Sequence, residues 1–205
     1  MQLLPIIRSN TKHGFSPGIK GPGKAAVQIV KSGPHNGKSQ IRDGVLKLIS
    51  RAECTIDIQT PYFIPNDAIM AALEVAAMRG VRVRLMIPAK ADHFFLHDAS
   101  LAFAGSLLAS RVRIFAYHNG FLHAKMLLVD EMAFMVGSAN MDERSFSLNF
   151  EATAFVYGKE MAMEMLRIFE LDIQASENLN ADFFAAVPLT GHIKQRIAKL
   201  IAPIL

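Results

Sequence analysis

The stretch that decides the fold is Phe121-Leu-His123-Ala-Lys125-Met-Leu-Leu-Val-Asp130-Glu-Met-Ala-Phe-Met-Val-Gly137-Ser138-Ala-Asn140. Its two apolar runs, 126–129 and 133–136, each predict a strand. His123 and Lys125 are two residues apart, so on a strand their side chains point to the same face. Ser138 and Asn140 repeat that spacing after the second run. We therefore expect an imidazole, an ammonium, a hydroxyl and an amide to converge at one end of a sheet.

This set of groups suits a phosphodiester substrate. Lys125 and the amide of Asn140 can hold the non-bridging oxygens, whose charge must be stabilised in the transition state. His123 can attack phosphorus or protonate the leaving oxygen. A carboxylate at Glu151, near the start of the expected strand 152–157, can accept from the second ring nitrogen of His123 and fix its tautomer. Asp130 is five residues from Lys125, which places it on the opposite face and predicts a structural role.

Each of these residues alone would more often be structural, but the joint spacing points to catalysis. The stretch resembles the HKD motif of the phospholipase D superfamily. A narrower resemblance, to bacterial cardiolipin synthases of that superfamily, rests on Gln59-Thr-Pro-Tyr-Phe-Ile-Pro65, Gly120-Phe-Leu-His-Ala-Lys125 and Asn140-Met-Asp-Glu-Arg-Ser-Phe-Ser-Leu-Asn-Phe-Glu151. It covers roughly residue 27 to the C-terminus and fits the second, C-terminal HKD half of those enzymes.

The resemblance implies a phospholipase D-like α/β fold, with a mixed β-sheet flanked by helices on both faces and one HKD lobe. It also implies the site residues, which are His123, Lys125, Ser138 and Asn140, with Glu151 supporting His123. We count Asp130 with the catalytic residues as the third letter of the motif, although its strand spacing assigns it a structural role. The implied reaction joins two phosphatidylglycerol molecules into cardiolipin and glycerol through a phosphohistidine intermediate.

Such synthases carry two HKD motifs, whereas this chain has one. It therefore pairs with a second copy, pairs with another HKD lobe, or is a fragment. If the chain is the C-terminal half of a two-motif enzyme, His123 is the general acid. If it is a homodimer, the two copies share the roles of nucleophile and general acid. The alternatives are a phospholipase D-like phosphodiesterase or nuclease acting as a homodimer, and an inactive truncated remnant. Lys plus Arg exceeds Asp plus Glu by only 22 − 18 = 4, so we expect no nucleic-acid partner.

Composition limits the class and location of the protein. Hydrophobic residues make up 51% of the 205, which allows a real core and excludes a disordered chain. No run of about 18 apolar residues is present. The single cysteine, Cys54, excludes an intrachain disulfide and fits a reducing compartment. With the lipid-substrate resemblance, we expect a peripheral protein on the cytoplasmic side of the cell (inner) membrane, or a cytoplasmic one if the chain is a soluble fragment.

The order of periodic segments predicts the domain organisation. Residues 1–26 read as a flexible linker, 27–188 as the phospholipase D-like domain and 189–205 as a basic amphipathic helix. Within the domain, strands near 27–30, 54–59, 81–87 and 111–117 alternate with helices near 39–51, 66–79 and 92–110, and a long helix covers 159–176. This rhythm favours an α/β layer architecture.

The last helix has an apolar face and a basic face. Two arrangements suit this pattern. The helix lies on an anionic membrane surface, or its apolar face packs on the domain and its charged face is in solvent. The apolar face carries Ile193, Ile197, Leu200, Ile201 and Ile204, and the basic face carries Lys194, Arg196 and Lys199.

Other polar residues carry weaker expectations. Tyr62 either lines the substrate pocket or packs on the core. His93 and His97 are one helical turn apart, but without a third ligand we expect a surface role rather than a metal site. Asp142 and Arg144 are expected to form a local ion pair. With no acidic cluster for Mg²⁺ and no phosphate-binding Gly-rich motif, we expect a metal-free reaction without a cofactor.

Overall fold

The computed structural model describes residues 25–34, 39–90 and 92–201. Within these residues an eight-stranded mixed sheet has the order β1-β9-β7-β6-β2-β4-β5-β10. Its strands are β1 (Ala26–Ser32), β2 (Thr55–Gln59), β4 (Arg82–Pro88), β5 (Arg113–Tyr117), β6 (Met126–Val129), β7 (Ala133–Gly137), β9 (Glu151–Tyr157) and β10 (Ser176–Asn178). The predicted α/β class with a mixed sheet is confirmed.

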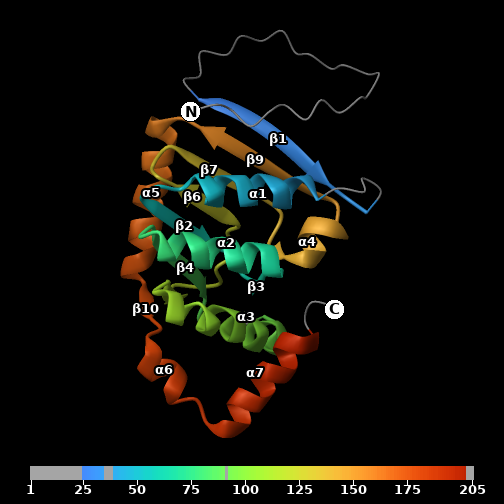
Figure 1. The fold of residues 1–205 in the computed structure, drawn as a ribbon, viewed down its shortest axis with the longest axis vertical. Coiled ribbons are helices and arrows are strands. Elements are labelled where there is room, and N and C mark those ends of the chain that lie inside the picture. The colour runs from blue at the N-terminus through green and yellow to red at the C-terminus, as the bar shows by residue number, and fades with distance from the viewer. Residues whose placement is uncertain (1–24, 35–38, 91, 202–205) are drawn as a thin grey trace.

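The helices form layers on both faces of this sheet. Helices α1 (Gln40–Arg51), α2 (Asp67–Met78) and α3 (Phe94–Ser106) cover one face, and α5 (Lys159–Gln174) covers the other (Figure 1). Strands β2, β4 and β5 are parallel, while β6 runs antiparallel to β2, with Met126 opposite Gln59 and Val129 opposite Ile56. The start of β6 therefore lies at the same edge as the carboxyl ends of β2, β4 and β5.

Several short elements were not predicted from the sequence. They are β3 (Phe63–Ile64), β8 (Met141–Asp142), the 3₁₀ turn Leu108–Ser110, α4 (Glu143–Ser147) and α6 (Ala181–Ala185). Strands β3 and β8 pair in parallel as a separate two-stranded sheet. This small sheet joins the segment around Tyr62 to the segment after Asn140, because the Met141 amide also donates to Thr60 Oγ1 at 3.2 Å.

The central strands are buried on both faces. The predicted strand 54–59 is present as β2, and its polar residues Asp57 and Gln59 are buried beneath α5 although their alternation with Ile56 and Ile58 is typical of a half-exposed strand. Asp57 accepts a hydrogen bond from Arg84 Nε at 2.6 Å, and another nitrogen of that guanidinium donates to Glu170 on α5 at 2.7 Å. Gln59 Nε2 donates to Asp172 of α5 at 2.7 Å. The alternating polar residues of β2 therefore face helix α5 and form hydrogen bonds at the interface between the sheet and that helix.

Side-chain caps set the beginning of some helices but not of others. Asn66 accepts from the Ile69 amide at 3.1 Å and caps α2, and Gly80 follows that helix with φ +93°, which a glycine adopts without strain. Ser39 precedes α1, but its hydroxyl bonds to that of Ser147 at 2.9 Å instead of capping the helix. The Ser39 side chain therefore contacts α4 and does not cap α1.

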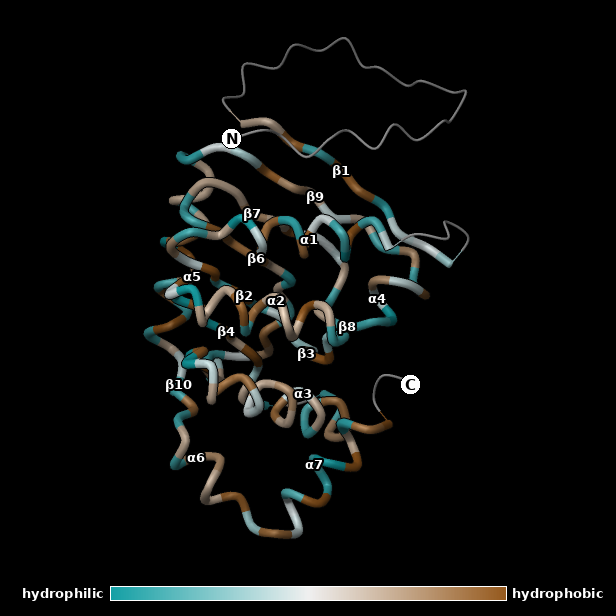
Figure 2. Tube along the Cα trace, viewed as in Figure 1, coloured by the Kyte–Doolittle hydropathy of each residue, from teal (hydrophilic) through white to brown (hydrophobic). Residues whose placement is uncertain are grey.

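The C-terminal helix α7 (Leu189–Ile201) packs against α3. Its buried residues are Gln195 and Ala198, while the predicted apolar face is exposed, with Leu200 at 76% and Ile193 at 50%. Figure 2 shows hydrophobic segments along this outer helix. Ile204 and the predicted linker up to residue 24 lie outside the described residues. No helix in the described ranges is long and apolar enough to cross a membrane.

Candidate active site

His123 and Lys125 lie in the segment that leads into β6. The prediction that they lie on a strand is wrong, because regular structure begins only at Met126. The Lys125 ammonium instead turns back and donates to the carbonyl oxygen of His123 at 2.9 Å. The His123 ring is exposed and stacks on Phe121, with ring centroids 5.5 Å apart. The backbone of His123 is thus held by Lys125 while its imidazole faces solvent.

Lys125 is the electrostatic centre of this edge of the sheet. Its side chain is only 8% exposed. Burial lowers the pKa of the Lys125 ammonium, and the carboxylates of Glu151, Asp142 and Asp92 oppose that shift. Burial and the three carboxylates therefore act on the Lys125 pKa in opposite directions, and burial has the larger effect.

The segment after β7 brings Ser138 and Asn140 to the same edge. The Gly137 amide donates to the Lys125 carbonyl at 3.3 Å, which joins the two segments. The Ser138 hydroxyl accepts from the Ala152 amide at 3.0 Å, so it is engaged with β9. Asn140 Oδ1 is buried without a hydrogen-bond partner among the described residues. Asn140 therefore retains an unused acceptor at the site, whereas Ser138 is already bonded.

Asp142 connects the site to α4. It accepts from the Ser145 amide at 2.7 Å and so caps that helix. Burial raises the pKa of Asp142, and hydrogen bonds with Ser145 and Asn140 oppose that rise. The predicted ion pair with Arg144 is wrong, because none is formed between them in the described ranges and Arg144 is exposed.

Tyr62 lies at this edge because β3 and β8 pair. Its hydroxyl donates to Asp92 Oδ2 at 2.6 Å, and burial together with Asp92 raises the pKa of Tyr62 well above its ordinary value. The role of Tyr62 in lining a substrate pocket stays a prediction. Asp92 was missed by sequence reasoning, since it belongs to no motif and precedes α3 with nothing local to mark it. Only the three-dimensional contact with Tyr62 identifies it.

Glu151 begins β9 and lies close enough to Lys125 to influence its pKa. Its carboxylate accepts from Asn149 Nδ2 at 3.3 Å. In the part of the chain that the structure describes, no hydrogen bond joins Glu151 to His123. The orienting role of Glu151 therefore stays a prediction.

Asp130 lies at the opposite end of β6 from Lys125. Its carboxylate accepts from the backbone amides of Glu53, Cys54 and Thr55 at 2.8, 2.7 and 2.7 Å. The four residues of β6 separate it from the site by roughly 13 Å, at about 3.3 Å per residue. Asp130 is therefore not at the site, and the grouping of Asp130 with the catalytic residues gives way to the structural role that its spacing predicted.

His93 and His97 lie at the start of α3, where His93 precedes the first turn. Burial lowers the pKa of His97, whose Nδ1 is buried without a hydrogen-bond partner in the described ranges. No group of three or more His, Cys, Asp or Glu residues that could hold a metal ion occurs among the described residues.

Solved structures identify the class of fold. Nuc from Salmonella typhimurium, a phospholipase D family member, superimposes with a TM-score of 0.65 at 21% identity, over 77% of this chain and 100% of that chain. A phosphatidylserine synthase from Haemophilus influenzae Rd KW20 gives a TM-score of 0.66 at 15% identity, over 91% and 47% of the two chains. The fold is therefore the phospholipase D-like one that the sequence predicted.

Sequence relatives define the family more narrowly. Residues 45–173 match the family described as "Cardiolipin synthase, PLD-like domain", and the chain belongs to that family. A cardiolipin synthase from Listeria monocytogenes serotype 4a is 43% identical over 194 residues, which are 95% of this chain and 40% of that protein. The chain thus spans about two fifths of the length of that curated relative, and the predicted resemblance is confirmed.

Proposed function

We propose that this chain is one HKD lobe of a phosphatidyltransferase of the cardiolipin synthase type. The observation that carries the proposal is the exposed imidazole of His123 beside a buried cation. The Lys125 ammonium donates to the backbone carbonyl of His123 and holds this residue in place. A nucleophile or proton donor that faces solvent beside a fixed cation suits phosphoryl transfer. Membership in the cardiolipin synthase family supports phosphatidylglycerol as the substrate.

The proposed reaction transfers the phosphatidyl group in two steps, first to a histidine and then to a second phosphatidylglycerol. In the first, a ring nitrogen of one catalytic histidine forms a bond to phosphorus of phosphatidylglycerol, and the bond to the glycerol oxygen breaks. The leaving glycerol takes a proton from a second imidazole, so the enzyme holds a phosphohistidine. In the second, the same second imidazole removes a proton from the hydroxyl of another phosphatidylglycerol, whose oxygen displaces the histidine and gives cardiolipin.

Each step needs an imidazole on either side of phosphorus, and His123 supplies one. In-line displacement places nucleophile and leaving group on opposite sides, so a second HKD lobe completes the site. That lobe is a second copy of this chain or another polypeptide. If the second lobe is a different polypeptide, His123 is the general acid. In a homodimer the His123 of one copy is the nucleophile while that of the other copy is the general acid.

The exposed side of α7 supports peripheral attachment to an anionic membrane. Leu189, Ile193, Ile197, Leu200 and Ile201 are exposed, although the alternative of a helix packed by its apolar face would have buried them. Lys194 and Arg196 are exposed on the same helix. Apolar side chains that enter the lipid boundary beside cations that attract its head groups are typical of interfacial helices. We propose that α7 holds the chain at the cytoplasmic face of the inner membrane.

The test is product analysis with vesicles that contain phosphatidylglycerol. Formation of cardiolipin and free glycerol in equal amounts is expected of the transferase. His118→Ala is the matched control for loss of an imidazole, because His118 is exposed and pairs with Glu177 of the edge strand β10, which β2, β4 and β5 separate from β6. Absence of both products from an assembly that contains two intact HKD lobes would overturn the proposal and leave the inactive remnant.

A homodimeric phosphodiesterase is the second candidate. It is favoured by one observation, that this chain covers the whole of the Nuc chain, so one lobe is a complete polypeptide there. With water as acceptor the product from phosphatidylglycerol is phosphatidic acid. The ratio of cardiolipin to phosphatidic acid therefore distinguishes the two candidates.

A further inference from the structure

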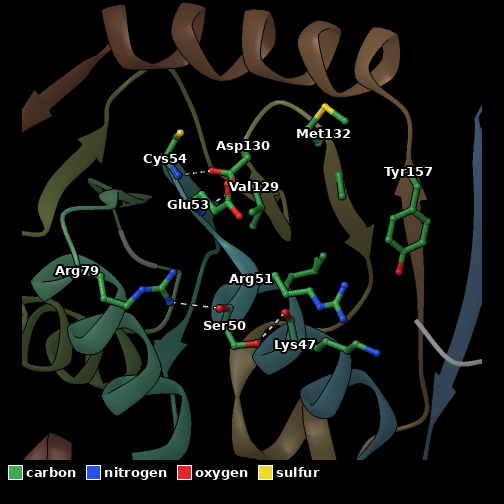
Figure 3. A pocket seen from close by; sticks show the side chains of 12 residues that line it. Lys47, Ser50, Arg51, Glu53, Cys54, Arg79, Val129, Asp130, Met132 and Tyr157 are labelled. Carbon is green, nitrogen blue, oxygen red and sulfur yellow. Dashed lines mark hydrogen bonds between the residues drawn. The ribbon is translucent and has the colours of Figure 1, made fainter. Parts of the chain in front are cut away.

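A cavity of about 610 Å³ lies at the edge of the sheet opposite His123. It is bounded by the end of α1, the turn before β2, the turn between β6 and β7, and the end of β9 (Figure 3). Its volume falls within the range of about 300–1,000 Å³ that is usual for small-molecule sites. Asp130, which anchors the far end of β6, forms part of its wall.

The inner wall of this cavity is apolar. Leu48 of α1, Val129 of β6 and Ala133 of β7 line it, and each is at most 6% exposed. Met132 lines it from the turn between the strands and is 40% exposed. An unbranched hydrocarbon chain is complementary to such a surface, because its burial removes apolar area from water.

A buried hydroxyl faces this cavity without a partner. Tyr157 is 9% exposed, and its hydroxyl oxygen has no hydrogen-bond partner among the described residues. A buried polar group without a partner is costly, which favours a ligand that supplies an acceptor. Burial also raises the pKa of Tyr157, so the phenol keeps its proton and donates at neutral pH.

Cations surround the same space. Lys47, Arg51 and Arg79 line the cavity, and Figure 3 shows the first two in the region toward which the Tyr157 hydroxyl points. Arg79 is held in place by hydrogen bonds to the carbonyls of Ser50 at 3.2 Å and Ala52 at 2.7 Å. The carboxylate of Asp130 is satisfied by three backbone amides, which leaves Glu53 as the other acidic group of the lining. The lining is therefore net positive.

We propose that this cavity binds a single-chain amphiphile with an anionic head. The hydrocarbon chain lies against Leu48 and Val129, and the head accepts from Tyr157 and pairs with Lys47. A phosphate and a carboxylate share this chemistry. The site is separate from the His123 edge and does not depend on the reaction proposed above.

Decyl phosphate, used below its critical micelle concentration, is the probe. Cys54 lines the cavity, but its sulfur points away from Lys47, Arg51 and Tyr157 (Figure 3), so titration calorimetry rather than alkylation of this thiol measures binding. We expect saturable binding of decyl phosphate by titration calorimetry, with one molecule bound per chain. Decanoate in place of decyl phosphate shows whether the site prefers a carboxylate or a phosphate head group. Inorganic phosphate tests the anionic head without a hydrocarbon chain, and decyl maltoside tests the same chain with an uncharged head.

Two variants locate the binding. Tyr157→Phe removes only the hydroxyl and should weaken decyl phosphate by about threefold to tenfold. Lys47→Gln should weaken it similarly, and it provides a second test on a partly exposed side chain that does not alter the core. Lys31→Gln is the charge-matched control, because Lys31 is exposed, is outside the cavity lining and pairs with Ala152, at the other end of β9 from Tyr157. It should leave binding unchanged.

Equal binding of decyl maltoside and decyl phosphate would overturn the anionic specificity. Lack of saturable binding by titration calorimetry, or loss of binding with Lys31→Gln but not with Lys47→Gln, would overturn the site. Neither result bears on cardiolipin formation, so failure here is distinguishable from failure of the proposed function.

Discussion

At the scale of single residues, the proposed function assigns the chemistry to the imidazole of His123. His123→Ala should abolish formation of cardiolipin, since loss of a general acid or base alone costs about 10²–10⁴ in rate. The exposed ring contributes little to stability, so the thermal midpoint should stay within a degree or two of wild type. Turnover and thermal unfolding are measured together, with His118→Ala as the control that keeps both. Wild-type turnover in His123→Ala would refute the assignment.

Gly137 is the residue whose absent side chain positions the loop after β7. A Cβ built there meets the carbonyl oxygen of Ala152 and lies 2.6 Å from Thr153 Cα, both on the neighbouring strand. Because backbone atoms cannot move aside, Gly137→Ala should lower the free energy of unfolding by about 1–3 kcal/mol.

The same substitution should reduce turnover, because it displaces Ser138 and Asn140. Val136→Ala, at an exposed position of the same strand, is the control and should change stability much less. Equal unfolding midpoints for the two variants in urea would contradict the packing argument.

At the scale of elements, the ion pair between Asp57 and Arg84 fastens adjacent strands beneath α5. Asp57→Ala leaves a buried guanidinium with Glu170 as its remaining carboxylate, and should cost about 3–5 kcal/mol. Asp43→Ala removes an exposed pair with Arg42 and should cost less than about 1 kcal/mol. Urea unfolding of both variants at neutral pH provides the comparison.

The pH dependence of stability follows from the same group. Burial raises the pKa of Asp57 above its ordinary value of 3.8, and Arg84 only partly offsets this. The folded chain therefore holds this proton more tightly than the unfolded chain, so its stabilising contribution grows as pH falls through the raised pKa and is complete below 3.8. This contribution should appear as a pH-dependent difference in the free energy of unfolding between wild type and Asp57→Ala, because the variant lacks the titrating group. A difference that does not vary between neutral pH and pH 3.8 would contradict it.

Helix α7 makes a separate prediction about the membrane. Replacing Ile193 and Leu200 together by Asn removes two exposed aliphatic side chains and should weaken binding to phosphatidylglycerol vesicles by at least about tenfold. The matched control replaces Val75 and Met78, which are exposed on α2, and should bind as wild type does. Co-sedimentation with vesicles measures both, and equal losses would show that attachment does not depend on α7.

The alternation of strands and helices was predictable from apolar periodicity, because a strand or helix that faces the core repeats its pattern over a whole element. The elements missed, β3, β8 and α4, are two to five residues long and depend on contacts between distant segments. The Tyr62 contact with Asp92 depends on those contacts too. His123 and Lys125 were assigned to a strand because the apolar run begins next to them, whereas the Lys125 ammonium bends back to the His123 carbonyl.

At the scale of the whole molecule, the question is how many chains make one active unit. Mixing His123→Ala chains with wild type under exchange conditions should lower turnover with the square of the wild-type fraction, if two copies share one site. Two-fold pairing is the commonest oligomer symmetry and would place the two His123 edges opposite each other. A linear fall, together with a monomeric mass for the active species, would show that one chain suffices.

Strand β6 also gives the motif its spacing. Lys125 precedes this strand and Asp130 follows it, so the interval between the two residues equals the length of β6 from one edge of the sheet to the other. A one-residue insertion or deletion within β6 would turn every later side chain to the other face and leave the backbone amides of Glu53, Cys54 and Thr55 without their carboxylate. Substitutions within β6 that keep its volume should be tolerated, whereas any change in its length should not.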